Sequence, residues 1–347
     1  MSTQRHIVLR AFPVGAPRPS DFDIERCELR AVPADHVQVQ THYLSMDPAP
    51  RLRMDPQSGT QALQLGQTVV GRGAGIVCAS NHPDFQRGDW VIGELGWQEF
   101  ATLPGDQLRK WDTGAGSPAA ALGVLGPSGI AAWCLVNIAA PVTSAATVAV
   151  TAAAGAVGSV VLQLARLAGA RTVALVAGSG QRDFVAAKLG ADLSLNVRAP
   201  GFSDDLAHAL RGNGIDIVFD SVGGELHNTL MAHLNAHARI IAYGYISRYN
   251  ESGAERSEYG RIYQLIHKRA HLSGFLVRDH AARFGEAMQE LSRLHAAGSL
   301  AGHEQILDGL EQVPNAFAAL FSADPLGKQL VRLIHPPQSS LESETRP

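Results

Sequence analysis

Small residues in one short stretch of the chain are spaced as an anion-binding turn requires. Residues 152–158 read AAAGAVG, which places Ala153, Gly155 and Gly158 in the pattern G-x-G-x-x-G with alanine in the first position. The two glycines let the backbone approach a pyrophosphate and let a helix pack closely on the preceding strand. The helix N-terminus adds free N–H groups and a partial positive charge. The pattern predicts a dinucleotide site; the alternative is close strand–helix packing without a ligand.

A serine and an arginine further along the chain indicate which dinucleotide would bind. Residues 172–177 (TVALVA) read as a second strand, and residues 178–182 (GSGQR) follow it without an acid. NAD sites usually place Asp or Glu at this strand end to hold the ribose 2′-hydroxyl. The Ser179 hydroxyl and the Arg182 guanidinium instead suit a 2′-phosphate. NADP is therefore favoured, and the alternative is that Arg182 is a solvated charge in a helical first turn.

These residues need a scaffold of alternating strands and helices. Helical patterns cover about 156–168 and 181–189, and others separate the later strands. Short β-branched runs are found at 147–151, 172–177, 216–220, 238–243 and 272–277. Alternation at this spacing predicts parallel βαβ units in a doubly wound sheet.

The first 110 residues follow a different pattern. Residues 36–45, 68–80 and 88–104 read as short strands separated by Gly, Pro and Asp turns, which predicts an all-β domain of barrel type. A helical segment (313–322) and a last strand (KQLVRLI) come near the end of the sequence. The polar, Pro-rich tail, residues 336–347, is expected to be disordered.

Composition excludes several classes of partner. The 347 residues are 46% hydrophobic and 18% charged, with a net charge of −3, so no basic footprint for nucleic acid or anionic lipid is expected. Residues 113–165 contain no charged side chain, but prolines and glycines interrupt them, so we interpret them as buried rather than membrane-spanning. No signal peptide is evident at the N-terminus, and the expected compartment is the cytoplasm.

Cysteine usage argues against a thiolate site. Cys27, Cys78 and Cys134 are widely separated, and no C-x-x-C occurs. The sequence therefore indicates neither a disulfide framework nor a cysteine metal cluster.

Seven motifs in order carry a resemblance that covers nearly the whole chain. They are YLSMDPAPRLRM (43–54), HPDFQRGDWVIGELGWQEFA (82–101), LGVLGPSGIAAW (122–133), AAAGAVGSVV (152–161), FDSVGGE (219–225), YGYISRYN (243–250) and LGKQLV (326–331). On these motifs the chain resembles the zinc-independent medium-chain dehydrogenase/reductases, in the branch of leukotriene/prostaglandin reductases and plant double-bond reductases.

The resemblance implies an α/β fold of two domains. A GroES-like β-barrel-type substrate domain (1–125, completed by 305–335) would enclose an inserted Rossmann NADP-binding domain (126–304). It also implies an enzyme, an NADPH-dependent reductase of the carbon–carbon double bond in α,β-unsaturated aldehydes and ketones (a 2-alkenal or enone reductase). In this family two subunits pair through the last Rossmann strand, so a homodimer is expected.

The resemblance also assigns residues to the cofactor NADP(H). Gly155, Ala156, Val157 and Gly158 would hold the pyrophosphate, and Ser179 and Arg182 would hold the 2′-phosphate. The remaining cofactor-binding residues, which line the nicotinamide side and the groove beside it, are Ser221, Tyr243, Gly244, Ile246, Ser247, Tyr249, Phe275 and Val277.

Tyr249 is the candidate catalytic residue, because it matches the tyrosine to which the family gives the contact with the substrate oxygen or with the ribose beside it. Hydride arriving at the β-carbon moves negative charge onto the carbonyl oxygen, and a hydrogen-bond donor there stabilises the enolate. The α-carbon proton can come from water.

The GHE triplet at 302–304 raises the question of a metal. Zinc-dependent relatives carry a GHE early in the catalytic domain, with a cysteine ligand some way before it. Here the triplet lies near the end of the chain, and the sequence contains no cysteine after Cys134, so we interpret the triplet as chance and predict no metal.

Four positions depart from the family pattern. Ala49 replaces a pocket aromatic, and Val197 replaces a nucleotide-side tyrosine. Ser221 and Pro325 each replace an asparagine. These changes suggest altered cofactor contacts and a wider substrate pocket, so quinone reduction and non-catalytic NADPH binding remain alternative functions.

Overall fold

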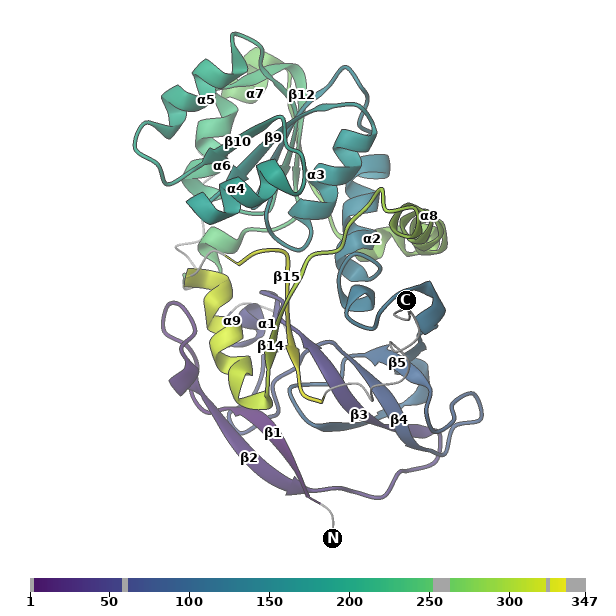
Figure 1. The fold of residues 1–347 in the computed structure, drawn as a ribbon. Helices are drawn as coiled ribbons and strands as arrows, with labels where there is room; N and C mark the ends of the chain where they lie inside the picture. The colour runs from purple at the N-terminus through teal and green to yellow at the C-terminus, as the bar shows by residue number, and fades with distance from the viewer. Residues whose placement is uncertain (1–2, 58–61, 252–262, 323–324, 335–347) are drawn as a thin grey trace, which may run out of the picture.

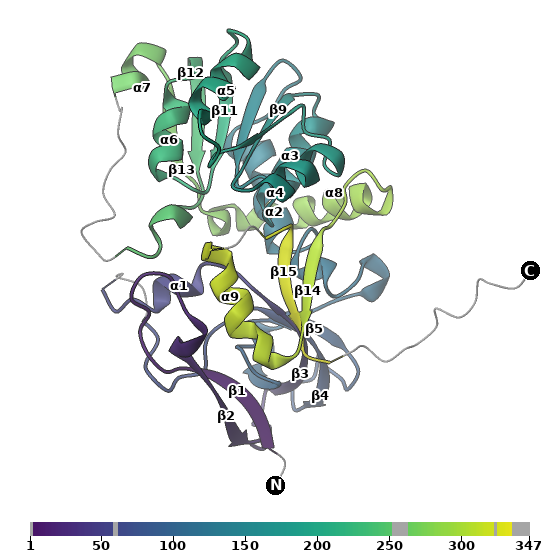
Figure 2. The ribbon, with the colours of Figure 1, turned by 60° about the vertical axis from the view of Figure 1, so that its left-hand side comes forward.

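The computed structural model describes residues 3–57, 62–251, 263–322 and 325–334, in a β-rich part and a part built on a parallel sheet (Figures 1 and 2). The chain begins in the β-rich part, forms the parallel sheet, and returns through the yellow segments labelled β14, α9 and β15. The last segment thus completes the part that the first segment begins.

Six parallel strands form the sheet of the second part. Their order is β10-β9-β8-β11-β12-β13, so the strand order reverses between β8 and β11. Open α/β sheets bind ligands beyond the carboxyl ends of their strands at such a reversal. The strands are β8 (Thr147–Thr151), β9 (Arg171–Val176), β10 (Leu193–Asn196), β11 (Ile215–Asp220), β12 (Leu234–Ala242) and β13 (His271–Gly274).

Helices cover both faces of this sheet. Successive strand residues point to opposite faces; Val148 and Val150 pack with one group of helices, whereas Ala149 packs with the other. The first group contains α2 (Pro127–Cys134), α3 (Gly158–Leu167), α4 (Ser179–Ala187) and α8 (Phe284–Ala296). The second contains α5 (Phe202–Leu210), α6 (Gly224–Met231) and α7 (Tyr263–Lys268). The doubly wound sheet predicted from periodicity is therefore present.

The β-rich part is a mostly antiparallel sheet that the end of the chain extends. Its order is β14-β15-β3-β4-β5-β7, with β6 paired to β3, and Leu330 of β15 lies opposite Ser45 of β3. The strands are β3 (His36–Ser45), β4 (Gly73–Ser80), β5 (Trp90–Gly93), β6 (Phe100–Pro104), β7 (Arg109–Lys110), β14 (Glu304–Asp308) and β15 (Lys328–Arg332). A hairpin of β1 (Thr3–Leu9) and β2 (Phe22–Glu28) and the helices α1 (Pro50–Arg53) and α9 (Val313–Ser322) complete it.

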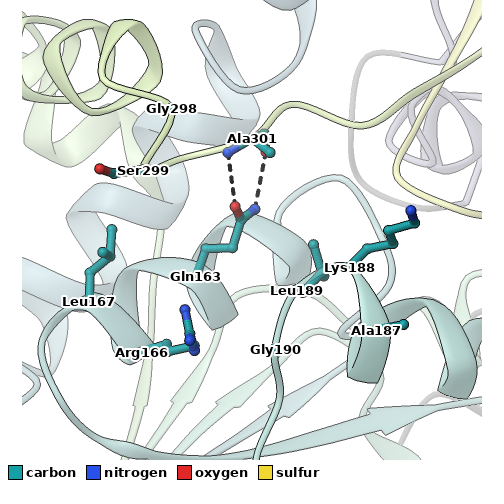
Figure 3. A pocket seen from close by; sticks show the side chains of 10 residues that line it. All are labelled: Gln163, Arg166, Leu167, Ala187, Lys188, Leu189, Gly190, Gly298, Ser299 and Ala301. Atoms are coloured by element: carbon teal, nitrogen blue, oxygen red, sulfur yellow. Dashed lines mark hydrogen bonds between the residues drawn. The ribbon is translucent and has the colours of Figure 1, made fainter.

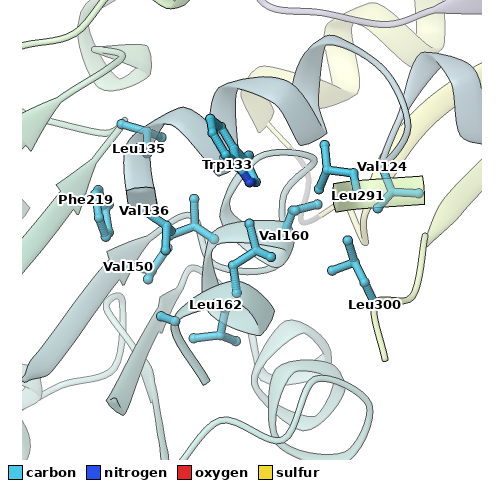
Figure 4. Packing of buried hydrophobic residues seen from close by; sticks show 14 of the residues in the cluster. Val124, Trp133, Leu135, Val136, Val150, Val160, Leu162, Phe219, Leu291 and Leu300 are labelled. Carbon is cyan, nitrogen blue, oxygen red and sulfur yellow. The ribbon is translucent and has the colours of Figure 1, made fainter. Parts of the chain in front are cut away.

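Much of the uncharged stretch at 113–165 is buried, although residues 113–115 and 143–145 are exposed. The stretch supplies α2, β8 and most of α3, which contribute many side chains to one apolar cluster (Figure 4). The same cluster includes Tyr43 and Ala74 of the β-rich part, so the two parts share a core. Among the described helices, none combines the length and apolarity needed to cross a bilayer.

One sequence prediction needs correction. The run at 272–277 is not one strand, because β13 ends at Gly274 and a 3-10 helix spans Val277–Arg283. Its neighbour β12 ends at Ala242, whose carbonyl accepts the last inter-strand bond from the Phe275 N–H at 2.9 Å, so no partner backbone extends further. The short strands β10 and β14 were not predicted. The tail at 336–347 lies outside the described residues.

Candidate active site

The glycine-rich turn connects β8 to α3 as predicted. A Cβ added at Gly158 would lie 2.4 Å from the Ala152 carbonyl oxygen, so only glycine allows the helix to start this close to the strand. The Gly155 N–H donates to the Ala152 carbonyl at 2.8 Å and closes the turn. Gly155, Ala156 and Val157 are partly exposed, so the outer surface of the turn is accessible to a ligand. The partial positive charge at the N-terminus of α3 favours an anion at this surface.

The predicted 2′-phosphate residues lie on the first turn of α4, beyond the end of β9. Ser179 and Arg182 are both exposed. The Arg182 side chain is 52% exposed, and it forms an ion pair with the exposed Asp183 at 3.6 Å. An exposed ion pair at this distance contributes little to stability. The guanidinium therefore remains accessible to a phosphate. Val197, at the end of the neighbouring β10, is partly buried against the core and presents no polar group.

A buried carboxylate organises the turn after β11. Asp220 is 1% exposed; one oxygen accepts from Thr151 Oγ1 at 3.0 Å and from the N–H groups of Val222 (2.9 Å) and Gly223 (3.0 Å). The other lies 3.0 Å from His227 Nδ1. Burial alone would raise the pKa of Asp220, but the hydrogen bonds from His227, Gly223 and Val222 more than offset it, so the pKa lies below its usual range.

This network was missed at the level of sequence, although FDSVGGE was recognised as a motif. It holds Ser221, whose N–H donates to Thr151 Oγ1 at 2.9 Å, beside the end of β8. An acid at the end of a buried strand, followed by Ser-Val-Gly-Gly, is the signal that could have identified it. Asp220 thus positions the turn without being a ligand candidate itself.

The loop after β12 packs directly on that turn. The Tyr243 N–H donates to the Asp220 carbonyl at 2.8 Å, and the Ile246 N–H donates to the Ser221 carbonyl at 3.0 Å. Ser247 Oγ donates to the Val222 carbonyl at 2.6 Å. A Cβ at position 244 would lie 3.0 Å from the Ser221 carbonyl oxygen, so the close approach favours glycine there. Burial raises the pKa of the Tyr243 phenol, so it stays protonated at neutral pH.

The other predicted residues of this part follow β12 and β13. Tyr249 comes immediately after a 3-10 turn, Ile246–Arg248, and its N–H donates to the Ile246 carbonyl at 3.3 Å. The Phe275 ring stacks on His280, with 5.2 Å between the ring centroids. Val277 begins the helix that follows. The structure thus brings Ser221, Tyr243, Gly244, Ile246 and Ser247 into contact, and it places Tyr249 in the loop after β12 and Phe275 directly after β13.

Residues 45–49 of the β-rich part contact Lys328, the residue after Gly327, which forms a bridge with Gly155 of the glycine-rich turn. Lys328 at the start of β15 is 3% exposed, and its ammonium contacts the Asp47 carboxylate and donates to the Met46 carbonyl at 3.1 Å. Ser45 Oγ donates to the other Asp47 oxygen at 2.6 Å. Burial alone would raise the pKa of Asp47, but Lys328, Ser45 and Arg72 more than offset it and lower the pKa. Ala49, two residues after Asp47, is exposed.

The GHE triplet lies at the crossing between the two parts. The His303 ring packs edge-on against Phe184 of α4, with 5.0 Å between the centroids. Burial raises the pKa of the Glu304 carboxyl. Within the described ranges, no three His, Cys, Asp or Glu side chains are grouped so that they could hold a metal ion.

Two family models match the chain. One, described as the N-terminal domain of oxidoreductase, matches residues 5–111, and the other, described as a zinc-binding dehydrogenase, matches residues 156–293. The NADPH-dependent curcumin reductase of Escherichia coli is 35% identical, over 95% of this chain and 96% of its own. The NADP(+)-dependent 2-alkenal reductase of Nicotiana tabacum is 31% identical, over 95% and 97%. The crystal structure of Vibrio vulnificus CurA with NADPH has a TM-score of 0.89 at 33% identity, covering 96% of this chain and 100% of that one.

Proposed function

Because the chain belongs to the zinc-independent medium-chain dehydrogenase/reductases, in their double-bond reductase branch, we propose that it reduces the carbon–carbon double bond of α,β-unsaturated aldehydes and ketones with NADPH. In this proposal residues 126–304 bind the cofactor. Residues 1–125 and 305–335 supply the substrate side.

One observation supports the proposal most directly. The carboxyl ends of β8, β9, β11 and β12 carry the glycine-rich turn, the Ser179–Arg182 turn, Ser221 and the loop after Tyr243, on the side where β15 and Asp47 approach. A dinucleotide laid along these strand ends would place its pyrophosphate at the positive N-terminus of α3 and its 2′-phosphate beside Arg182. The absence of an acid between Val176 and Arg182 in the sequence suits NADPH rather than NADH.

The chain's residues then have separable tasks. NADPH supplies the hydride that attacks the β-carbon of the substrate. The Tyr249 hydroxyl is proposed to donate a hydrogen bond to the carbonyl oxygen as negative charge develops on it. The enolate then takes its α-carbon proton from water. The buried Asp220 network keeps the turn at Ser221 and the loop after Tyr243 in register, so that the groove is formed before the ligands bind.

Oxidation of NADPH with a panel of enals, enones and quinones tests the activity. We expect turnover with enals or enones. The exposed Ala49 widens the groove relative to a family aromatic, so bulky quinones belong in the panel. Turnover with quinones alone would identify a quinone reductase. NADPH binding without turnover on any acceptor would identify a non-catalytic binding protein.

Arg182→Ala should weaken NADPH binding by on the order of tenfold or more and leave NADH binding nearly unchanged. One charge-assisted hydrogen bond to a phosphate contributes roughly 1.5–3 kcal/mol. Fluorescence titration with both cofactors measures the two dissociation constants, and Arg293→Ala, an exposed arginine on α8, is the control. Equal losses for the two cofactors would remove Arg182 from the 2′-phosphate site.

We further propose a homodimer formed along β13, the outer strand of the parallel sheet. An unpaired strand edge invites pairing with another chain, and a two-fold axis makes such pairing self-complementary. A Cβ at Gly274 meets no atom within 4 Å, so Gly274→Lys should fold while two lysines meet at the interface. Sedimentation should show a dimer for the natural chain and a monomer for the variant. A natural chain that stays monomeric at all concentrations would contradict the proposal.

A further inference from the structure

Gln181 is the buried side chain in an otherwise exposed helical turn. It is 8% exposed, whereas Ser179, Gly180, Arg182 and Asp183 around it are exposed. It occupies the third position of α4, where a glutamine can reach back to the backbone before the helix. The N-cap residue of α4 is Gly178, which has no side chain to hold this turn.

The Gln181 amide uses both of its ends. Its Oε1 accepts from the Ala177 N–H at 2.9 Å, at the end of β9. Its Nε2 donates to the carbonyl of Pro325 at 2.9 Å, and Pro325 lies 144 positions further along the chain. Pro325 has neither an N–H nor a polar side chain, so its carbonyl is the group through which the amide can reach this segment.

The Pro325 segment is in turn fixed to the glycine-rich turn. The Gly327 N–H donates to the Ala154 carbonyl at 2.7 Å, and Gly327 forms a parallel bridge with Gly155. The next residue is Lys328, whose ammonium holds Asp47. Two hydrogen bonds, Gln181 to Pro325 and Gly327 to Ala154, therefore connect the turn that carries Ser179 and Arg182 to the turn that carries Gly155.

We propose that Gln181 is a positioning residue for NADP selectivity. Its amide bonds to the backbone of Ala177 and Pro325 fix the distance between the first turn of α4 and the glycine-rich turn. At this distance a cofactor whose pyrophosphate lies on Gly155–Gly158 can place its 2′-phosphate against Arg182. The inference rests on the proposed cofactor site and adds to it a buried residue that positions Arg182 without contacting the cofactor.

An amide is the group that satisfies both contacts. A methionine of similar length fills the space but leaves the Ala177 N–H and the Pro325 carbonyl without this partner. A glutamate keeps the bond from Ala177 but turns a second acceptor toward the Pro325 carbonyl, and it adds negative charge near the phosphate. Both substitutions should displace the first turn of α4 and with it Arg182. The displacement should weaken the binding of NADPH, which carries a 2′-phosphate, more than that of NADH.

Gln181→Met is the test, with dissociation constants for NADPH and NADH measured by fluorescence titration of the full chain. We expect the preference for NADPH over NADH to fall by about tenfold, because a displaced Arg182 loses most of its charge-assisted hydrogen bond to the 2′-phosphate. In an Arg182→Ala background the same substitution should leave the preference unchanged, because the contact it positions is already gone. Gln181→Glu, which keeps one bond, provides a second variant and should shift the preference in the same direction.

Gln163→Met is the matched control. Gln163 on α3 is also 8% exposed, and its amide also bridges distant backbone, accepting from the Ala301 N–H at 2.9 Å and donating to the Ala301 carbonyl at 3.1 Å (Figure 3). It lines a hollow of about 330 Å³ with Arg166 and Lys188, and that lining contains neither Ser179 nor Arg182. Gln163→Met should therefore cost stability without changing cofactor preference.

The outcomes separate the inference from the function it rests on. A natural chain that binds NADPH no better than NADH would overturn the 2′-phosphate site itself. A natural chain that prefers NADPH while Gln181→Met and Gln181→Glu keep the full preference would overturn the role of Gln181 alone. Equal weakening of both cofactors, or the same shift in Gln163→Met, would reduce Gln181 to a residue that only stabilises the fold.

Discussion

Asp47→Asn is expected to lower the free energy of unfolding at pH 7 by about 2–3 kcal/mol. Breaking a fully buried ion pair from one side typically costs about 3–5 kcal/mol, because the remaining charge has no compensation. The Lys328 side chain is only 3% exposed, but the Asp47 side chain is 40% exposed, so water can partly replace the carboxylate. Denaturation in urea, followed by tryptophan fluorescence, measures the loss.

The pH dependence has a defined sign. The pKa of Asp47 is lower in the folded chain than the value of about 3.9 for an unfolded aspartate. Its contribution is therefore fully present above that value and is lost as the pH falls through the folded pKa. The difference between the natural chain and Asp47→Asn should be constant near neutrality and should shrink below about pH 4.

A double variant distinguishes the charge pair from local packing. Lys328→Met removes the buried ammonium, so Asp47→Asn with Lys328→Met should recover much of the stability that Asp47→Asn loses. If the double variant is no more stable than Asp47→Asn, the loss comes from packing around residues 45–49. If Asp47→Asn costs less than about 1 kcal/mol, the pair is as weak as an exposed one.

The features predicted correctly from the sequence are determined by residues that lie close together in the chain. Alternating runs identified the parallel strands, and the spacing of Gly155 and Gly158 identified the turn after β8, because both are set within one strand–turn–helix unit. The fold class followed from the repetition of that unit. Strand ends were less accurate, as at Gly274, because a parallel strand ends where its neighbour ends rather than where its own apolar run does.

The contacts that sequence did not predict join distant segments. The Asp47–Lys328 pair spans 281 positions and the Gln181–Pro325 bond spans 144. In the sequence, Gln181 is an unassigned residue between the two candidate phosphate ligands Ser179 and Arg182. Pro325 draws attention only because it replaces an asparagine of the family pattern. Only the return of the chain to the β-rich part shows that the Pro325 carbonyl meets an amide. Asp220 was overlooked because its partners include Thr151, on another strand.

Tyr249→Phe is expected to lower the rate of the chemical step by about ten- to a thousandfold while NADPH affinity is retained. Removing one donor to a developing oxyanion typically costs about 2.7–4 kcal/mol, and water entering a partly exposed site reduces that cost. The backbone that carries Tyr249 is fixed by the Ile246–Ser221 and Ser247–Val222 bonds, at 3.0 and 3.2 Å, so loss of the hydroxyl should leave the loop in place. Single-turnover hydride transfer at saturating NADPH, with the best acceptor of the panel, measures the step.

Tyr263→Phe is the matched control, since Tyr263 is 54% exposed on α7, and it should leave the rate unchanged. If Tyr249 only packs beside the nicotinamide or contacts its ribose, Tyr249→Phe should instead change KM for NADPH and leave the single-turnover rate at the natural value. That outcome would remove Tyr249 from the chemical step. Catalysis would then depend on the orientation of substrate and cofactor along the strand ends, for which the Asp220 network is the supporting structure.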